Sequence, residues 1–260
     1  MTKANWNKFT KAREEFRGIV DGLSHSLPLL RGIQQQFINS RSDGKNSAYR
    51  VETPVVYNTA LDDITINDEI KLILVADNPG RREQAAENRR YLVGPSGKIA
   101  NKFFRENPVL GIDYQKNVII LNKTPIHSPR TAELRRLCLL EAETGGHSIA
   151  SALEESQKTI AGLLFKFHEA LDCPVWITGY SEMKKGGIFQ SYMESIKTLY
   201  ANKKERYKQI FIYRHFSMNQ FTIDLKQQTL PGETILNSLE RIGAMYRGRI
   251  LERDHSASID

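Results

Sequence analysis

Cysteine is scarce in this sequence. Only Cys138 and Cys173 occur, far apart and in no Cys-x-x-Cys spacing. This excludes zinc and iron–sulfur sites built on a cysteine framework. A disulfide framework is not expected either, which fits a reducing compartment. We therefore expect a cytoplasmic protein, associated with the nucleoid if the source is bacterial.

Long apolar runs are also absent, and no stretch approaches the length that spans a bilayer. The N-terminal stretch MTKANWNKFTKAREEFRG is charged throughout and lacks the apolar core of a signal peptide. Internal repeats and low-complexity segments are missing as well. These absences predict a protein with no membrane partner.

Acidic residues are outnumbered. The 260 residues include 37 Lys and Arg against 30 Asp and Glu, a net charge of +7. A positive excess favours polyanionic partners, nucleic acid first, although a generic basic surface fits this charge equally well. The length allows one large α/β domain or two small ones, and a chain of this size can bury a core that is stable without disulfide bonds.

Four short apolar runs are typical of buried strands. They are IKLILVAD (70–77), NVIILNKT (117–124), CPVWITG (173–179) and QIFIYRHF (209–216). Their apolar residues are continuous rather than alternating, which indicates a parallel sheet covered on both faces. Helical periodicity lies between them, most clearly over 149–171 and 233–251. The pattern predicts a three-layer α/β/α sandwich with a central four-stranded, mainly parallel sheet.

The first part of the chain is expected to be helical over residues 5–38, with Pro28 interrupting or ending the first helix. A polar loop at 39–50 marks the best boundary. We therefore divide the chain into an N-terminal helical extension (1–48), packed on the core, and an α/β/α domain (49–260). The run PVVYNTAL (54–61) is predicted to form an edge strand or an extended arm.

Polar or turn-forming residues follow each predicted strand. They are Asp77–Asn78, Asn122, Gly179–Tyr180–Ser181 and His215. Ligands of parallel α/β sheets bind outside the carboxyl ends of the strands, so these residues should meet at one crevice. Each has an ordinary alternative when taken alone: a turn, a strand-end cap or a structural histidine. Their joint order favours a functional site.

The stretch GPSGK (94–98) invites comparison with a nucleotide-binding phosphate loop. That motif needs four residues between its glycines and Ser or Thr after the Lys, whereas here two residues intervene and Ile99 follows. An NTPase is therefore excluded. The stretch could open a helix whose free N–H groups hold a single phosphate, or it could be an ordinary helix start.

Five segments together resemble the uracil-DNA glycosylase superfamily, over Leu72 to Gln220. They are VADNPG, RRYLVGPSGKIANKFF, NVIILNKTPIHSP, WITGYSEMKKGG and RHFSMNQF. The resemblance implies a uracil-DNA-glycosylase-like fold and a monofunctional DNA glycosylase. Such an enzyme hydrolyses the N-glycosidic bond of a flipped, damaged base, here most simply uracil.

The resemblance also implies roles for individual residues. Tyr91, or as second choice Leu92, would stack on the base. Asn122 would pair with the base edge, and His215 would donate a hydrogen bond to O2 of the departing base. Asn78 would position the attacking water, and Asp77 is the possible base.

The resemblance also implies a second set of residues, which would contact the DNA backbone around the pocket. Its members are Ser96, Lys98, Ser128, Arg130, Lys184, Lys185 and Ser217. Arg81 and Arg82 would contact phosphates or cap their loop. The expected partner is therefore damaged DNA, single- or double-stranded. We expect no cofactor, no metal and a monomer.

Several positions depart from the superfamily pattern. Ala76 stands where glycine is usual, Phe216 replaces the proline of His-Pro-Ser, and the position that often carries a leucine wedge reads Met218–Asn219. These departures keep hypoxanthine and xanthine open as substrates. They also keep open a protein that binds nucleic acid or a nucleotide without cutting it.

Overall fold

The computed structural model describes residues 1–40, 49–142 and 148–252. Its centre is a sheet of four strands in the order β2-β1-β3-β4, with all neighbours parallel. The strands are β1 (Leu72–Ala76), β2 (Val118–Asn122), β3 (Val175–Thr178) and β4 (Ile210–Tyr213). All four predicted strands are confirmed, each shorter than its apolar run, and the sheet is wholly rather than mainly parallel.

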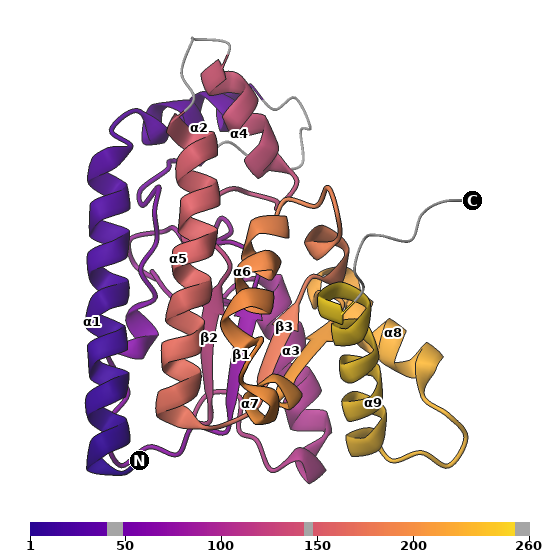
Figure 1. Ribbon diagram of the computed structural model, residues 1–260. Helices are drawn as coiled ribbons and strands as arrows, with labels where there is room; N and C mark the ends of the chain where they lie inside the picture. Colours follow the sequence, from indigo (N-terminus) through magenta and orange to yellow (C-terminus); the bar gives the residue numbers. More distant parts are fainter. Residues whose placement is uncertain (41–48, 143–147, 253–260) are drawn as a thin grey trace.

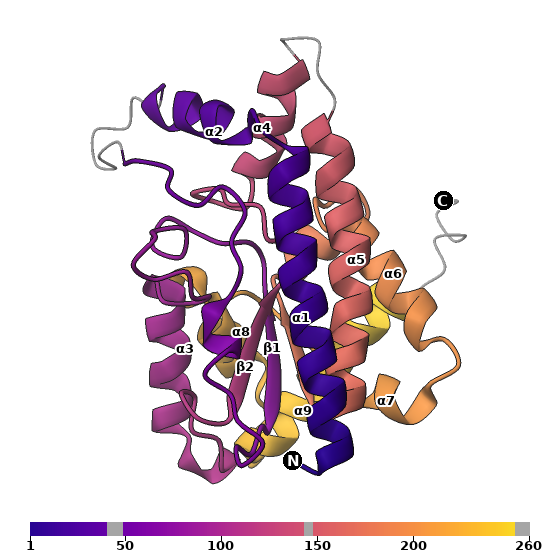
Figure 2. The same cartoon turned by 90° about the vertical axis from the view of Figure 1, so that its left-hand side faces the viewer.

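Helices cover both faces of the sheet, as Figures 1 and 2 show. One side carries α1 (Lys3–Ser26), α5 (Ser148–Leu171) and α6 (Gln190–Tyr200), and the other carries α3 (Pro95–Glu106), α8 (Gln220–Gln228) and α9 (Ile235–Arg247). On the α3 side, Trp176 of β3 stacks against Phe104 and Phe221, with ring centroids 5.5 and 5.9 Å apart. Both faces are thus buried, which explains why the strands have no polar alternation.

Shorter helices complete the chain. They are α2 (Leu30–Asn39), α4 (Glu133–Ala142), α7 (Lys204–Lys208), the 3₁₀ turns Thr59–Leu61, Pro108–Leu110, Tyr180–Met183 and Ser217–Asn219, and a π-helical turn at Gly248–Glu252. The last helix, predicted over 233–251, is therefore an α-helix that ends at Arg247 and continues as a π-turn. Among the described residues, none of the helices combines the length and apolar character needed to cross a bilayer.

The N-terminal helices belong to the main core. Pro28 separates α1 from α2, as predicted. Phe9 of α1 packs on Phe167 of α5 with ring centroids 5.4 Å apart, and Phe16 packs on Tyr57 at 5.2 Å. The N-terminal helices therefore pack on the sheet domain. The predicted division between residues 48 and 49 falls at the edge of a segment outside the described residues.

The run PVVYNTAL forms an extended arm rather than an edge strand. Its only ladder contact in the described chain is an antiparallel bridge between Val55 and Ile126. Asn58 Nδ2 donates to the Ile120 carbonyl (2.8 Å) and so satisfies an acceptor on the outer edge of β2. This arm protects the sheet edge from pairing with another chain.

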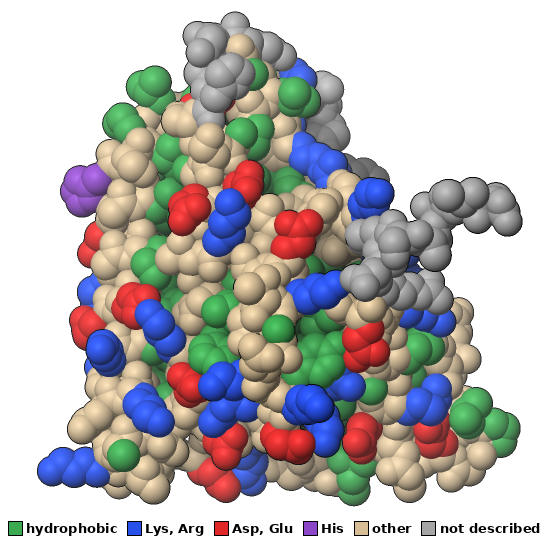
Figure 3. Space-filling model, in the orientation of Figure 1, with side chains coloured by type: hydrophobic (Ala, Val, Ile, Leu, Met, Phe, Trp, Pro, Cys, Tyr) green, Lys and Arg blue, Asp and Glu red, His purple; other side chains and the backbone are tan. Residues whose placement is uncertain are grey.

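The surface over α1, α5 and α6 mixes charges of both signs. Figure 3 shows Lys and Arg side chains interspersed with Asp and Glu over most of this face. The net positive charge is therefore not displayed there as one continuous basic patch.

Candidate functional site

Asn122 is the last residue of β2 and the register partner of Ala76 on β1. Paired residues of neighbouring strands point to the same face of a sheet. Asn122 is only 3% exposed, and its Nδ2 has no hydrogen-bond partner within the described part of the chain. A buried donor without an acceptor costs about 1–3 kcal/mol, so this amide marks a place where a ligand acceptor would be stabilising.

His215 follows β4 by two residues, and its ring orientation is fixed locally. Its Nδ1 accepts a hydrogen bond from the Ser217 backbone N–H (3.0 Å). Burial lowers the pKa of His215, against the opposing effect of Asp77, and Lys123 lowers it further. The ring is therefore neutral at neutral pH, with its proton on Nε2, which leaves an N–H donor for a ligand.

Asp77 lies at the end of β1 with both carboxylate oxygens engaged. Oδ1 accepts from Lys123 Nζ (2.5 Å) and Oδ2 accepts from Thr131 Oγ1 (3.1 Å). Burial would raise the pKa of Asp77, but the charge of Lys123 and the hydrogen bonds from Lys123 and Thr131 outweigh it and hold that pKa below its ordinary value. Gly179, at φ 90°, lies so close to Asp77 that a Cβ there would overlap Oδ1.

Lys123 was not foreseen as a site residue, yet it joins three strand ends. It follows Asn122 of β2, contacts Asp77 after β1, and donates to the Thr178 carbonyl of β3 (2.6 Å). Its side chain is fully buried, and burial lowers its pKa against the opposing charge of Asp77. A lysine placed directly after an apolar strand was the signal that could have identified it.

Asn78 is anchored through one end of its amide. Its Nδ2 donates to Ser128 Oγ (3.0 Å) and to the Ser128 carbonyl (3.2 Å), while its Oδ1 has no hydrogen bond among the described residues. That oxygen remains an acceptor for water, as the predicted role requires.

Ser128 therefore differs from its predicted role as a phosphate contact. The residue is 1% exposed, and its hydroxyl donates to the Arg130 carbonyl (2.8 Å) while accepting from Asn78. It orients the Asn78 amide instead of facing solvent. The sequence could not show this because the serine lies in a loop that folds back under the turn at Pro79.

Two buried titratable groups hold that turn. Glu83 Oε2 accepts from the Gly80 backbone N–H (2.6 Å), and His127 Nδ1 donates to the Pro79 carbonyl (2.8 Å). Burial raises the pKa of Glu83 to about 7, although the backbone N–H groups of Gly80 and Leu92 oppose it. Burial likewise lowers the pKa of His127 to about 4. Neither residue was singled out from the sequence.

Glu83→Gln should change how stability depends on pH. The folded protein holds a proton on Glu83 up to pH about 7, whereas the ordinary value is 4.5, so this carboxyl makes stability fall as pH rises between those values. His127 acts oppositely between about 4 and 6.5. Urea unfolding should show the variant gaining about 3 kcal/mol over wild type from pH 4.5 to 7.5. The prediction would be contradicted if the unfolding free energies of Glu83→Gln and wild type changed in parallel with pH. It would also be contradicted if Glu87→Gln, on the exposed part of the loop, gained the same stability.

Tyr91 packs inward. Its hydroxyl donates to the Val56 carbonyl (2.6 Å), its ring lies 6.4 Å from that of Phe16, and it is 3% exposed. These contacts hold the Tyr91 ring in the core beneath α1. They give no support to the prediction that it stacks on a base. Leu92, the second choice, has a left-handed backbone (φ 53°) that is uncommon for leucine. Its carbonyl lies so close to Gly97 that a Cβ there would overlap it.

The other predicted backbone contacts have more accessible positions. Lys98, Arg130, Lys184 and Lys185 are exposed, and Ser96 and Ser217 are partly exposed. Gly94 caps α3, which begins at Pro95. Arg81 lies over the Tyr49 ring at 4.8 Å, and Arg82 is exposed.

The loop after His215 combines a buried and a protruding residue. Phe216 is fully buried and stacks on Phe221 (4.3 Å) between α3 and α8. Met218 is 83% exposed and, like the following Asn219, has a left-handed backbone, with φ of 52° and 58°. Consecutive left-handed residues other than glycine are costly and cluster at functional sites.

Within the part of the chain that the structure describes, no three His, Cys, Asp or Glu side chains are grouped to hold a metal ion. Comparison with family models, with curated proteins and with solved structures found no match to this chain. Function must therefore be inferred from the residues and geometry of the site.

Proposed function

We propose that this protein is a monofunctional DNA glycosylase that removes a flipped, deaminated base, with uracil as its first substrate. One observation carries the proposal: at the carboxyl edge of the sheet, the buried Nδ2 donor of Asn122 and the Nε2–H of His215 both lack an acceptor among the described residues. Four of the five segments that resemble the uracil-DNA glycosylase superfamily contain or directly follow the end of a sheet strand. This supports our proposal that the fold is related to that superfamily.

Asn122 reads the base in this proposal. Its Nδ2 donates to a carbonyl oxygen such as O4 of uracil, and its Oδ1 accepts the adjacent ring N–H. Cytosine presents an amino group where uracil presents O4, so it would leave the buried donor without an acceptor. A keto group at that position also occurs in hypoxanthine and xanthine, which keeps both as candidate substrates.

His215 stabilises the leaving group. As the C1′–N bond breaks, its electron pair departs with the base, and negative charge develops on the base oxygen. A neutral imidazole with Nδ1 already occupied by the Ser217 N–H offers a fixed donor to that oxygen. The donor needs no reorganisation during the reaction.

Asn78 and Asp77 serve the sugar side. Asn78 Oδ1 orients a water whose oxygen forms the new bond to C1′ as positive charge develops on the sugar. Asp77 remains ionised because its pKa is lowered. A carboxylate of lowered pKa is a weak base, so its charge stabilises the oxocarbenium-like sugar more than it removes the water's proton.

The exposed Met218 fits a protein that opens duplex DNA. Apolar side chains that enter base steps unstack them, and a flipped base leaves a gap to fill. Met218 protrudes from the loop that also carries His215 and Ser217. The wedge thus lies within a few residues of the group that would act on the base.

A non-cutting nucleic-acid binder is the second candidate. The observation that favours it is the engagement of both Asp77 oxygens by Lys123 and Thr131, which leaves no unbonded carboxylate oxygen for proton abstraction. This protein would bind a damaged base through Asn122 and release it intact. Measuring base release alongside DNA binding separates the two candidates.

Asn122→Asp should reduce uracil excision about a hundredfold at pH 8, because a carboxylate cannot donate to O4 and repels its developing charge. Single-turnover release of uracil from a labelled oligonucleotide gives the rate. Asn202→Asp, the same change at an exposed position, should leave it unaltered. Equal rates for Asn122→Asp and wild type would remove Asn122 from the reading role.

A further inference from the structure

Two tyrosines whose rings meet at a tilted angle lie beside the candidate site. Tyr180 follows Gly179 at the end of β3, Tyr246 lies near the end of α9, and their ring centroids are 4.2 Å apart. Both rings are largely buried. The pair joins the carboxyl edge of the sheet to the C-terminal helix.

Three cations surround this ring pair, and we call them the basic platform: Lys184, Arg214 and Arg249. Lys184 Nζ lies 4.6 Å from the Tyr180 centroid, and Arg249 Cζ lies 5.6 Å from that of Tyr246. Arg214 reaches the pair through Asp224, which accepts from Arg214 Nε (3.0 Å) and from the Tyr246 hydroxyl (2.8 Å).

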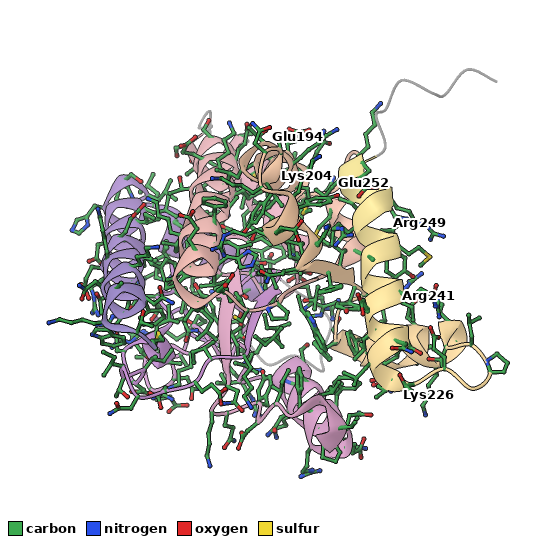
Figure 4. The ribbon with its side chains drawn as sticks, turned by 60° about the horizontal axis from the view of Figure 1, so that its bottom comes forward. Glu194, Lys204, Lys226, Arg241, Arg249 and Glu252 are labelled. Atoms are coloured by element: carbon green, nitrogen blue, oxygen red, sulfur yellow. The ribbon has the colours of Figure 1, made fainter. Side chains whose placement is uncertain are left out.

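Two cations of the platform, Lys184 and Arg249, are exposed and form no ion pair with a carboxylate of the described chain. Arg214 is paired with Asp224 (3.0 Å), and its side chain remains 47% exposed. Arg241 of α9 is likewise paired, with Glu233 at 2.7 Å, and is not part of the platform. Figure 4 shows Arg249 projecting from the end of α9 into solvent.

We propose that the basic platform binds the phosphodiester backbone of DNA on the His215 side of the site, through Lys184, Arg214 and Arg249. This inference rests on the proposed function and extends the DNA contact to the C-terminal helix, where no residue had been assigned to it. The partner is a nucleic-acid strand because its successive phosphates match several separated cations.

The placement of the platform supports this assignment. Arg214 immediately precedes His215, and Lys184 lies in the turn that follows β3. A strand whose base enters between Asn122 and His215 would therefore pass the platform next. Cation–π contacts hold Lys184 and Arg249 over aromatic faces, which reduces the side-chain freedom that phosphate binding would otherwise have to restrict.

The test measures how DNA affinity depends on salt. Each phosphate neutralised on a single strand contributes about 0.7 to the slope of log affinity against log salt. Fluorescence anisotropy with an undamaged single-stranded oligonucleotide should therefore give a slope lower by about 0.7 for Arg249→Gln and by about 1.4 for Lys184→Gln/Arg249→Gln. Arg249→Lys, which keeps the charge, should retain the wild-type slope.

Lys8→Gln/Lys11→Gln on α1 is the matched control, since it removes two exposed cations from the opposite side of the molecule. An unchanged slope in the platform double variant, or an equal fall in the control, would overturn the platform while leaving the proposed glycosylase intact. If wild type binds with the expected slopes but releases no base, the platform stands and the glycosylase fails. If wild type does not bind DNA, both fail.

Discussion

Replacing His215 by alanine should reduce single-turnover base release from uracil-containing DNA about 100- to 1000-fold, while DNA binding persists. The loss corresponds to one preorganised donor to a developing anion, about 3–4 kcal/mol of transition-state stabilisation. Burial lowers the pKa of His215, so the wild-type rate should fall only when acid protonates the ring and removes the acceptor of the Ser217 N–H.

The matched control is His25→Ala, which removes an exposed histidine of α1. Its rate should equal that of wild type. His215→Ala with an unchanged rate and unchanged pH profile would show that no donor acts on the base from this position. A fall in the rate that is matched by a fall in thermal stability would instead assign His215 a structural role.

Replacing Lys123 by methionine should destabilise the folded protein by about 3–5 kcal/mol at pH 8. The change leaves Asp77 charged and buried without its 2.5 Å partner, although Thr131 still donates to it. Without Lys123, burial would raise the pKa of Asp77. In the folded variant, Asp77 would then keep its proton at pH values at which the unfolded chain has already released it, above about pH 4. The loss of stability relative to wild type should therefore grow as pH rises above ~4.

The double variant Lys123→Met/Asp77→Asn completes the cycle. Removing both charges should recover much of the lost stability, because no unpaired ion stays buried. Lys166→Met provides the comparison: that lysine forms an equally short but exposed ion pair with Glu15, whose loss should cost at most about 1 kcal/mol. Equal costs at the two lysines, or no recovery in the double variant, would contradict a buried strand-end ion pair.

The sheet was predictable because its strands are buried on both faces. The run IKLILVAD places apolar residues at every position of β1, and all five strand residues are buried. A parallel sheet follows, and with it the meeting of Asp77, Asn122 and His215 at one edge. The strand order was not predictable, since apolar runs of similar composition do not say which neighbours pair.

Contacts between distant segments were the part of the site that the sequence could not show. Lys123 and Asp77 are 46 positions apart; the position of the lysine after an apolar strand marks it as a strand-end residue, but does not show that its side chain turns inward to pair with Asp77. The left-handed turn at Leu92 is a second example. Both Leu92 and Tyr91, the better stacker by chemistry, are buried in the interior beside this turn.

One measurement tests the central claim most directly. Purified protein is incubated with single- and double-stranded oligonucleotides carrying one uracil, hypoxanthine or xanthine, and alkali then cleaves any abasic site. We predict release of at least one of these bases, uracil first, with His215→Ala about 100-fold slower or more. No release from any substrate, with salt-sensitive DNA binding retained, would contradict the glycosylase and favour the non-cutting binder.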